Sequence, residues 1–158
     1  MEKSVDQGGN RDFATLLQNA FDLKEVPIES YSPLALAFIG DSVYDLIIKS
    51  IVLNEGNRQV QKLHQATSEL VQASTQSLIM RTLQEQLSPD ELQIYRRGRN
   101  AKSVSPAKNQ SLTDYRRATG FEALLGYLYI EKKWERMIEL VRLGLEATNK
   151  LENHSTTT

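Results

Sequence analysis

Residues 34–53, LALAFIGDSVYDLIIKSIVL, constrain the fold more than any other part of this chain. In a helix they place apolar side chains on nearly every side, and a helix of that kind belongs in the interior of a protein. Ser32 is predicted as the N-cap and Pro33 as the first helical residue, because a hydroxyl cap followed by proline favours a helix start. We therefore expect a long helix from Pro33 to about Leu53 in the middle of the fold.

The rest of the chain also has the periodicity of helices. Apolar residues recur at three- and four-residue intervals, and no segment alternates as a strand does. Ser88 and Glu91 form a capping box, from which a helix should run to a stop at Gly98, and Thr113 with Asp114 caps another. The expected helical segments are 12–21, 33–53, 60–71, 73–87, 88–98, 113–130 and 134–151. The predicted fold class is all-α, a helical bundle without internal repeats.

Length and composition fit one soluble domain. The chain has 158 residues, 40% of them hydrophobic, which leaves room for one core. We expect this domain over residues 12–151, with polar tails over 1–11 and 152–158. No run approaches a membrane span and the start lacks the apolar core of a signal peptide, so a cytoplasmic protein without a membrane partner is expected. The absence of cysteine and the presence of only two histidines exclude thiolate zinc sites, thiol nucleophiles and sites with several imidazole ligands.

Two carboxylates stand where the helical pattern does not explain them. Asp41 lies in the apolar segment 34–53, and Glu122 lies in GFEALLGYLYI. Neither has a basic residue three or four positions away, and burying an unpaired carboxylate is costly. Gly40 beside Asp41 and Gly126 one turn after Glu122 lower helix propensity, which indicates the close approach of another backbone or of a ligand.

A distant arginine or buried hydrogen bonds could account for one such carboxylate. Two of them on neighbouring helices, in a chain without cysteine, suit a hard divalent cation such as Mg²⁺, which prefers oxygen ligands. Asp45 precedes Lys49 by four residues, so we interpret Asp45 as an ordinary ion-pair partner. The sequence thus predicts Asp41 and Glu122 as a pair of metal ligands.

Residues 96–117, which we call the basic belt, carry a formal charge of +6, and the rest of the chain carries −7. Their middle part, 99–110, is predicted to be a long loop, and such loops are often functional. A cationic segment just before Glu122 suits a phosphate backbone, although a solvated loop can have the same composition. Tyr95, which precedes the belt, could contact ribose or pack internally. The candidate nucleic-acid-binding residues are Arg96, Arg97, Arg99, Asn100, Lys102, Lys108, Arg116 and Arg117.

Several motifs resemble those of the ribonuclease III family. LALAFIGDSVYDL is similar to the signature helix of that family, and GFEALLGYLYI is similar to its second carboxylate helix. RRGRNAK, the loop with SPAKNQ, and YRRATGFEALLGYLY resemble the short bacterial branch, Mini-ribonuclease III, which has no appended double-stranded-RNA-binding domain. The resemblance covers residues 28–148. It implies an all-helical homodimer that cuts double-stranded RNA with Mg²⁺ and leaves 5′-phosphate and 3′-hydroxyl ends.

The resemblance also assigns roles to individual residues. The family's catalytic aspartate falls on Asp41 and its later glutamate on Glu122, while Ala37 and Thr119 stand where full-length members have further acids. The implied mechanism is that a divalent cation, Mg²⁺ or Mn²⁺ as a substitute, activates water while the basic belt holds the backbones of an A-form duplex. For the short branch, the resemblance implies a role in maturing precursor large-subunit (23S) ribosomal RNA.

Three other functions remain open at this point. A non-catalytic double-stranded-RNA-binding module would keep the basic belt without needing Asp41 or Glu122. A helical interaction protein would use the belt only to solvate a loop. A phosphohydrolase of small nucleotides would need the carboxylates but would have little use for the belt.

Overall fold

The computed structural model describes residues 11–102 and 111–150, and every regular element in these ranges is helical. The chain divides into two compact units, residues 1–30 and 31–158. The first contains α1 (Phe13–Phe21) and the 3₁₀ helix η1 (Ile28–Ser30). The second contains α2 (Pro33–Asn54), α3 (Val60–Val71), α4 (Ala73–Leu83), the 3₁₀ helix η2 (Gln84–Gln86), α5 (Pro89–Asn100), α6 (Leu112–Ile130) and α7 (Trp134–Ala147). The predicted all-α class is confirmed.

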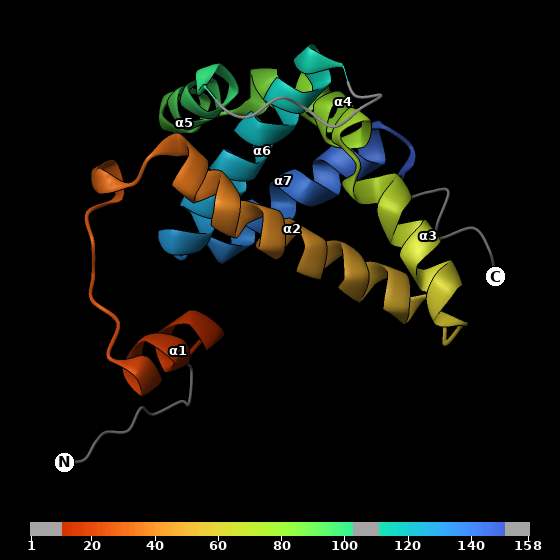
Figure 1. Cartoon of the computed structure of the whole chain (residues 1–158), viewed down its shortest axis with the longest axis horizontal. Coiled ribbons are helices and arrows are strands. Elements are labelled where there is room, and N and C mark those ends of the chain that lie inside the picture. The colour runs from red at the N-terminus through yellow and green to blue at the C-terminus, as the bar shows by residue number, and fades with distance from the viewer. Residues whose placement is uncertain (1–10, 103–110, 151–158) are drawn as a thin grey trace. The chain divides into compact units, whose positions relative to one another are not determined.

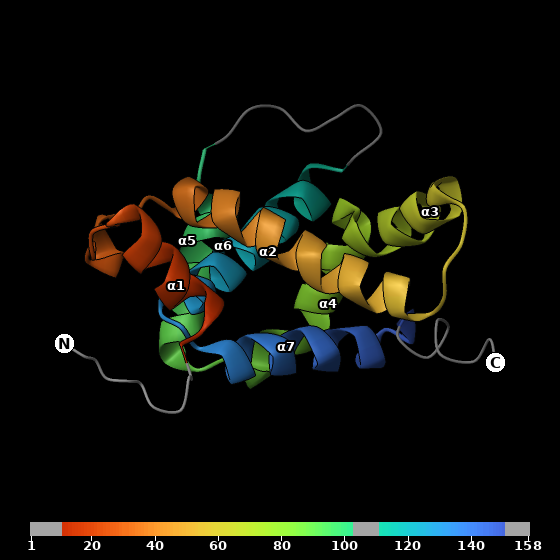
Figure 2. The ribbon, with the colours of Figure 1, turned by 90° about the horizontal axis from the view of Figure 1, so that it is seen from below.

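Helix α6 forms the centre of the second unit, and α2, α4, α5 and α7 pack against it (Figure 1). From Ala118 to Leu128 every residue is buried except Glu122, which is half-buried. Figure 2 shows α7 running alongside α4, with which it is in contact. Within the described ranges, the structure contains no helix with the length and apolar character of a membrane span.

Helix α2 does not lie at the centre, and this prediction from the sequence was wrong. Its inner face is buried against α6 and α3, but Phe38, Leu46 and Leu53 on the outer side are 79%, 65% and 60% exposed. The packing of this unit covers only one side of α2, because α6 occupies the central position. As a result Asp41 is exposed, whereas the sequence suggested a buried carboxylate.

The predicted helix starts are mostly confirmed. The Ser32 hydroxyl accepts a hydrogen bond from the Ala35 amide at 3.0 Å, and Pro33 is the first residue of α2. The capping box of α5 is formed by Ser88 and Glu91. The N-cap of α6 is instead Ser111, two residues before the predicted cap Thr113, since the hydroxyl of Ser111 accepts from the Asp114 amide at 2.9 Å. The acidic side chain then stands in the first turn, where it complements the helix dipole.

Three predicted helix ends need correction. Helix α5 continues through Gly98 to Asn100, so this glycine is not a stop signal. A Cβ at Gly98 would lie 2.8 Å from the Cβ of Ala123 and 3.0 Å from the Cα of Gly120, so the position needs glycine for close packing on α6. Helix α4 ends at Leu83, where η2 takes over, and α7 ends at Ala147. The periodic pattern continues past both ends, which explains why the sequence predicted longer helices.

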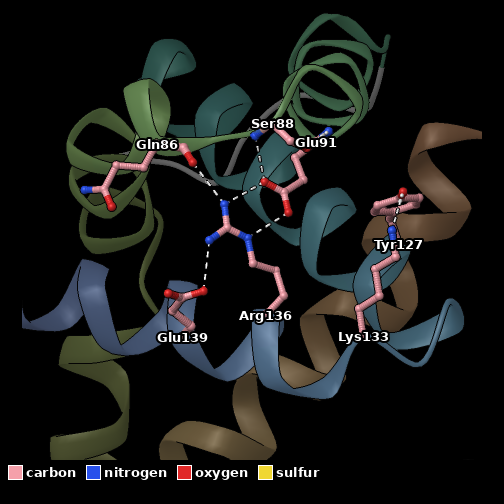
Figure 3. A network of polar contacts seen from close by, with 7 residues as sticks. All are labelled: Gln86, Ser88, Glu91, Tyr127, Lys133, Arg136 and Glu139. Atoms are coloured by element: carbon pink, nitrogen blue, oxygen red, sulfur yellow. Dashed lines mark hydrogen bonds and ion pairs between the residues drawn. The ribbon is translucent and has the colours of Figure 1, made fainter.

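An ion-pair network joins the start of α5 to α7 (Figure 3). The Arg136 guanidinium donates to both carboxylate oxygens of Glu91 at 2.8 and 2.9 Å, to the Gln86 carbonyl at 2.9 Å and to Glu139 at 2.9 Å. Glu91 is buried and also accepts from the Ser88 amide at 2.9 Å. These hydrogen bonds, those from Arg136 first, hold the pKa of Glu91 below its ordinary value. The network fixes one end of α5, whose other end carries the basic belt.

Candidate active site

The crossing of α2 and α6 brings two backbones into direct contact. A Cβ at Gly40 would overlap the carbonyl oxygen of Glu122 and lie 2.7 Å from the amide nitrogen of Gly126. A Cβ at Gly126 would overlap the carbonyl oxygen of Leu36. The predicted close approach at both glycines is thus confirmed, and the partner is a backbone at each of them.

This crossing places Asp41, the neighbour of Gly40, beside Glu122. The two carboxyl groups are within hydrogen-bonding reach of each other, and Glu122 is the more enclosed of the two. Burial and the charge of Asp41 together raise the pKa of Glu122 to about 8. In the absence of a cation, Glu122 therefore holds its proton more readily than an ordinary glutamate does. Such a pair also offers oxygen ligands to a cation.

The donor set fits a cation that keeps most of its water. No group of three or more histidine, cysteine, aspartate or glutamate side chains suited to a metal occurs in residues 11–102 and 111–150. Ala37 and Thr119 are buried, and the Thr119 hydroxyl donates to the Tyr115 carbonyl at 2.9 Å. Mg²⁺ is commonly held by one or two carboxylates together with waters and substrate phosphates, so a pair of carboxylates suffices. Asp45 is not part of this set.

Two side chains near the pair have simpler roles. Asp45 forms an ion pair with Lys49 at 3.0 Å, as the sequence predicts. Tyr44 is fully buried beneath the crossing, where its hydroxyl donates to the Leu70 carbonyl at 2.7 Å and its ring meets the edge of Phe121. Burial, and secondarily the charge of Glu122, raise the pKa of Tyr44. This tyrosine is a neutral packing residue.

Gln76 of α4 is a site residue that sequence reasoning missed. It is only 2% exposed, and its Nε2 donates to Glu122 Oε2 at 3.2 Å. A signal for it does exist in the sequence. Gln76 interrupts the apolar stripe of α4, where Ala73, Met80 and Leu83 are buried at helical spacing.

The first half of the basic belt lies at the end of α5, which packs on α6 near Glu122. Gly98 packs on α6 beside Ala123, so its neighbours Arg97 and Arg99 are held close to the carboxylate helix. The Arg99 guanidinium lies 5.6 Å from the ring centre of Tyr95. Tyr95 itself is fully buried, so of its two predicted roles the packing role applies.

The second half of the belt begins α6. Arg116 is exposed, and Arg117 is half-buried, with its Nη1 donating to the Ser77 hydroxyl at 3.5 Å. Ser77 follows Gln76 directly, so adjacent residues of α4 contact a belt arginine and a carboxylate of the pair. Arg99 and Asn100 belong to the last turn of α5, where the sequence predicted loop. Lys108 and the loop residues 103–110 lie outside the described residues.

Four basic residues of the belt are available to a ligand. Arg96, Arg97 and Arg116 are exposed and form no ion pair with any residue of the described ranges. Lys102 is exposed as well. Most structural arginines have a carboxylate partner, as Arg136 does, so exposed arginines without one indicate a surface for an external anion.

The helical fold and a facing pair of carboxylates beside a cationic surface define the class to which this chain belongs. The model of the Ribonuclease III domain matches residues 34–133, which include both carboxylates and the whole basic belt. A crystal structure of a protein from Fusobacterium nucleatum superimposes with a TM-score of 0.70 and 29% sequence identity, and the match covers 75% of this chain and 97% of the other.

Curated relatives narrow the class further. The chain is 40% identical to the Mini-ribonuclease 3 of Clostridium tetani over 84% of this chain and 89% of that protein. It is 42% identical to the Mini-ribonuclease 3 of a Thermoanaerobacter species over 82% of this chain and 92% of that protein. The chain belongs to the ribonuclease III family, in its Mini-ribonuclease 3 branch, and it is an endoribonuclease. The family acts on double-stranded RNA and depends on divalent metal ions.

Proposed function

We propose that this protein cleaves double-stranded RNA with Mg²⁺ held between Asp41 and Glu122, and that Mn²⁺ can replace Mg²⁺. The observation that carries the proposal is the juxtaposition of the two carboxyl groups across the α2–α6 crossing. When bound, the cation supplies Lewis-acid activation of water and stabilises the charge on the leaving oxygen. Hydrolysis in which the 3′ oxygen leaves gives 5′-phosphate and 3′-hydroxyl ends.

The protein residues contribute ligands and a rigid frame. Asp41 and Glu122 provide carboxylate oxygens from two helices whose backbones touch at Gly40, so their spacing is set by packing and not by loops. Glu122 is the half-buried member, which limits the access of water to one side of the pair. A nucleophile and a phosphate held at fixed positions react faster because their relative motion is already restricted.

The basic belt is proposed to hold the two backbones of the duplex. The exposed arginines have charge available for phosphates, and the deep major groove of A-form RNA hides base edges from side chains. Recognition should therefore depend more on duplex shape and charge than on sequence, and binding should weaken strongly with salt. The full proposed set is Arg96, Arg97, Arg99, Asn100, Lys102, Lys108, Arg116 and Arg117.

We also propose a homodimer that forms through the outer face of α2. Leu34, Phe38, Leu46 and Leu53 are exposed and fall within about 120° of the helix circumference at 3.6 residues per turn. Large apolar side chains exposed on one side of a helix mark an interaction site, although Ser42 and the Asp45–Lys49 ion pair share this side, and symmetric dimers are the commonest soluble oligomers. Two copies would bring one carboxylate pair to each strand of a duplex.

The proposed substrate is precursor 23S ribosomal RNA, which the sequence resemblance supports. The single nuclease domain over residues 12–151, with tails at 1–11 and 152–158, and the cytoplasmic location stay predictions. The non-catalytic RNA-binding module is the alternative that the following experiment separates.

The test compares wild type with Asp41→Asn and Glu122→Gln on a long RNA duplex, and scores cleavage and binding separately. With Mg²⁺ we expect cleavage by wild type only, and none in EDTA. Both variants should still bind the duplex, because the belt is unchanged. If wild type binds but never cuts with any divalent cation, or if both variants cut at the wild-type rate, the proposal is wrong.

A further inference from the structure

Gln76 is a buried polar residue of α4 that lies between Ala73 and Met80 on the inner side of the helix. Its Nε2 donates two hydrogen bonds, one to the Val71 carbonyl at 2.8 Å and one to Glu122 Oε2 at 3.2 Å. Val71 is the last residue of α3, so one side-chain amide connects the end of that helix to a carboxylate of α6. Apart from Asp41, no other side chain among residues 11–102 and 111–150 is within hydrogen-bonding reach of Glu122.

The orientation of the Gln76 amide follows from its partners. Both Val71 O and Glu122 Oε2 are acceptors, so the NH₂ group must face them. The amide oxygen Oε1 is then left buried with no hydrogen-bond partner among the described residues. A buried acceptor of this kind destabilises the fold, and an apolar side chain of the same size would avoid that loss. The bond to the Val71 carbonyl serves the fold, and the bond to Glu122 is the part of this arrangement that bears on the carboxylate pair.

We propose that Gln76 is a positioning residue, whose amide holds Glu122 Oε2 and so orients the carboxylate toward Asp41 for cation binding. This inference rests on the proposed function of the Asp41–Glu122 pair. A glutamate side chain otherwise has several rotamers, and ordering it when the cation binds has an entropic cost. The hydrogen bond from Gln76 orders Glu122 before the cation arrives and leaves its second oxygen for the cation. Groups that orient metal ligands in this way contribute about 10- to 100-fold to metal affinity.

The test measures cation affinity in the protein without RNA. Mn²⁺ is titrated into the full-length protein, and free Mn²⁺ is followed by electron paramagnetic resonance. Gln76→Met has nearly the same size and no donor, and we expect it to bind Mn²⁺ about 10-fold or more weakly. Thr75→Val is the matched control, because Thr75 is equally buried on α4 but donates to the Glu69 carbonyl, away from the pair. The control should bind Mn²⁺ as wild type does.

A double-mutant cycle separates positioning from general damage. In a Glu122→Gln background, Gln76→Met should have no further effect on Mn²⁺ affinity, because the carboxylate that it positions is gone. Unchanged Mn²⁺ affinity in Gln76→Met, or an equal loss in both backgrounds, overturns the inference. If Glu122→Gln itself binds Mn²⁺ as well as wild type does, the proposed cation site fails instead, so the two failures are distinguishable.

A second variant serves if Gln76→Met does not fold. Gln76→Glu keeps the shape but replaces the donor by a third carboxylate beside the pair. We expect a lower unfolding midpoint without cation and a larger rise of that midpoint on adding Mn²⁺ than in wild type, because the cation now offsets additional repulsion. A rise equal to or smaller than that of wild type overturns the inference.

Discussion

Replacing Gly40 by alanine tests whether the touching backbones of α2 and α6 hold the site together. Helix propensity and packing predict opposite effects of this substitution on the free energy of unfolding. Alanine is about 1 kcal/mol better than glycine inside a helix, so propensity alone predicts a more stable protein. The added Cβ, however, would overlap the Glu122 carbonyl oxygen and lie 2.7 Å from the Gly126 amide nitrogen.

The expected loss of stability follows from how far α2 and α6 must move apart to restore ordinary contact distances. Ordinary Cβ contacts begin at 3.4 Å, so the Gly126 amide alone requires the helices to separate by about 0.7 Å, and the overlapping Glu122 carbonyl oxygen requires more in this close-packed region. Overpacking of this kind costs about 1–3 kcal/mol, with the upper part of the range expected for two backbone contacts. After the gain in propensity, we expect a net loss of about 2 kcal/mol. At about 2–4 °C per kcal/mol for a chain of this size, the unfolding midpoint should fall by roughly 4–8 °C.

The same displacement should affect cleavage more than stability. Moving one carboxylate by nearly 1 Å relative to the other can reduce the rate by as much as about 100-fold. Thermal unfolding and duplex cleavage are measured on Gly40→Ala, with Ser50→Ala as a control at an exposed position of the same helix, away from the carboxylate pair. A Gly40→Ala protein that is as stable as wild type or more stable, and that cuts at the wild-type rate, would refute the role assigned to the crossing.

Three further predictions concern the ion-pair network, the dimer and the basic belt. Arg136→Met should lower stability by about 2–3 kcal/mol near neutral pH, because the buried charge of Glu91 loses its partner. Since the folded-state pKa of Glu91 lies below its ordinary value of 4.5, this contribution is complete above pH 4.5 and is lost as the pH falls through the folded-state pKa. Urea unfolding across that range should show the difference from wild type shrinking in acid, and a difference that stays constant contradicts the pairing. Phe38→Glu should sediment as a monomer. The control Gln93→Glu makes the same charge change at an exposed site of α5 and should stay dimeric. A dimeric Phe38→Glu would exclude the outer face of α2 as the interface. In duplex binding, Arg96→Ala and Arg97→Ala should each reduce the slope of log affinity against log salt concentration by about 1. The control Lys62→Ala on α3 should leave this slope unchanged. Equal slopes in all three variants would show that these arginines are not part of the RNA interface.

Local sequence signals predicted the starts of α2 and α5 well. A serine followed by proline, and a serine three residues before a glutamate, satisfy the free amides at a helix start whatever surrounds them. The glycines at 40 and 126 were also informative, because a residue that weakens a helix is retained where two backbones touch. Gly98 carries the same meaning, but from sequence alone it cannot be told from a helix stop, since both use a residue without a side chain.

The arrangement of the helices was harder to predict. Both α2 and α6 are apolar on most sides, and periodicity does not say which of them the other helices surround. The exposed outer face of α2 reflects this limit, because an apolar face can be covered by the same chain or by another. Gln76 was missed for a related reason. Its partner Glu122 is 46 positions away, and only the packing of α4 on α6 brings the two side chains together.

The account depends most on a divalent cation bound between Asp41 and Glu122. The direct measurement is a crystal structure of the protein grown with Mn²⁺, with anomalous diffraction used to locate the ion. We predict an anomalous peak in contact with one carboxylate oxygen from each residue, and no such peak in Glu122→Gln crystals grown in the same way. A protein that cuts duplex RNA with Mn²⁺ in solution, yet binds the ion only at other residues in the crystal, would contradict the assignment of the site.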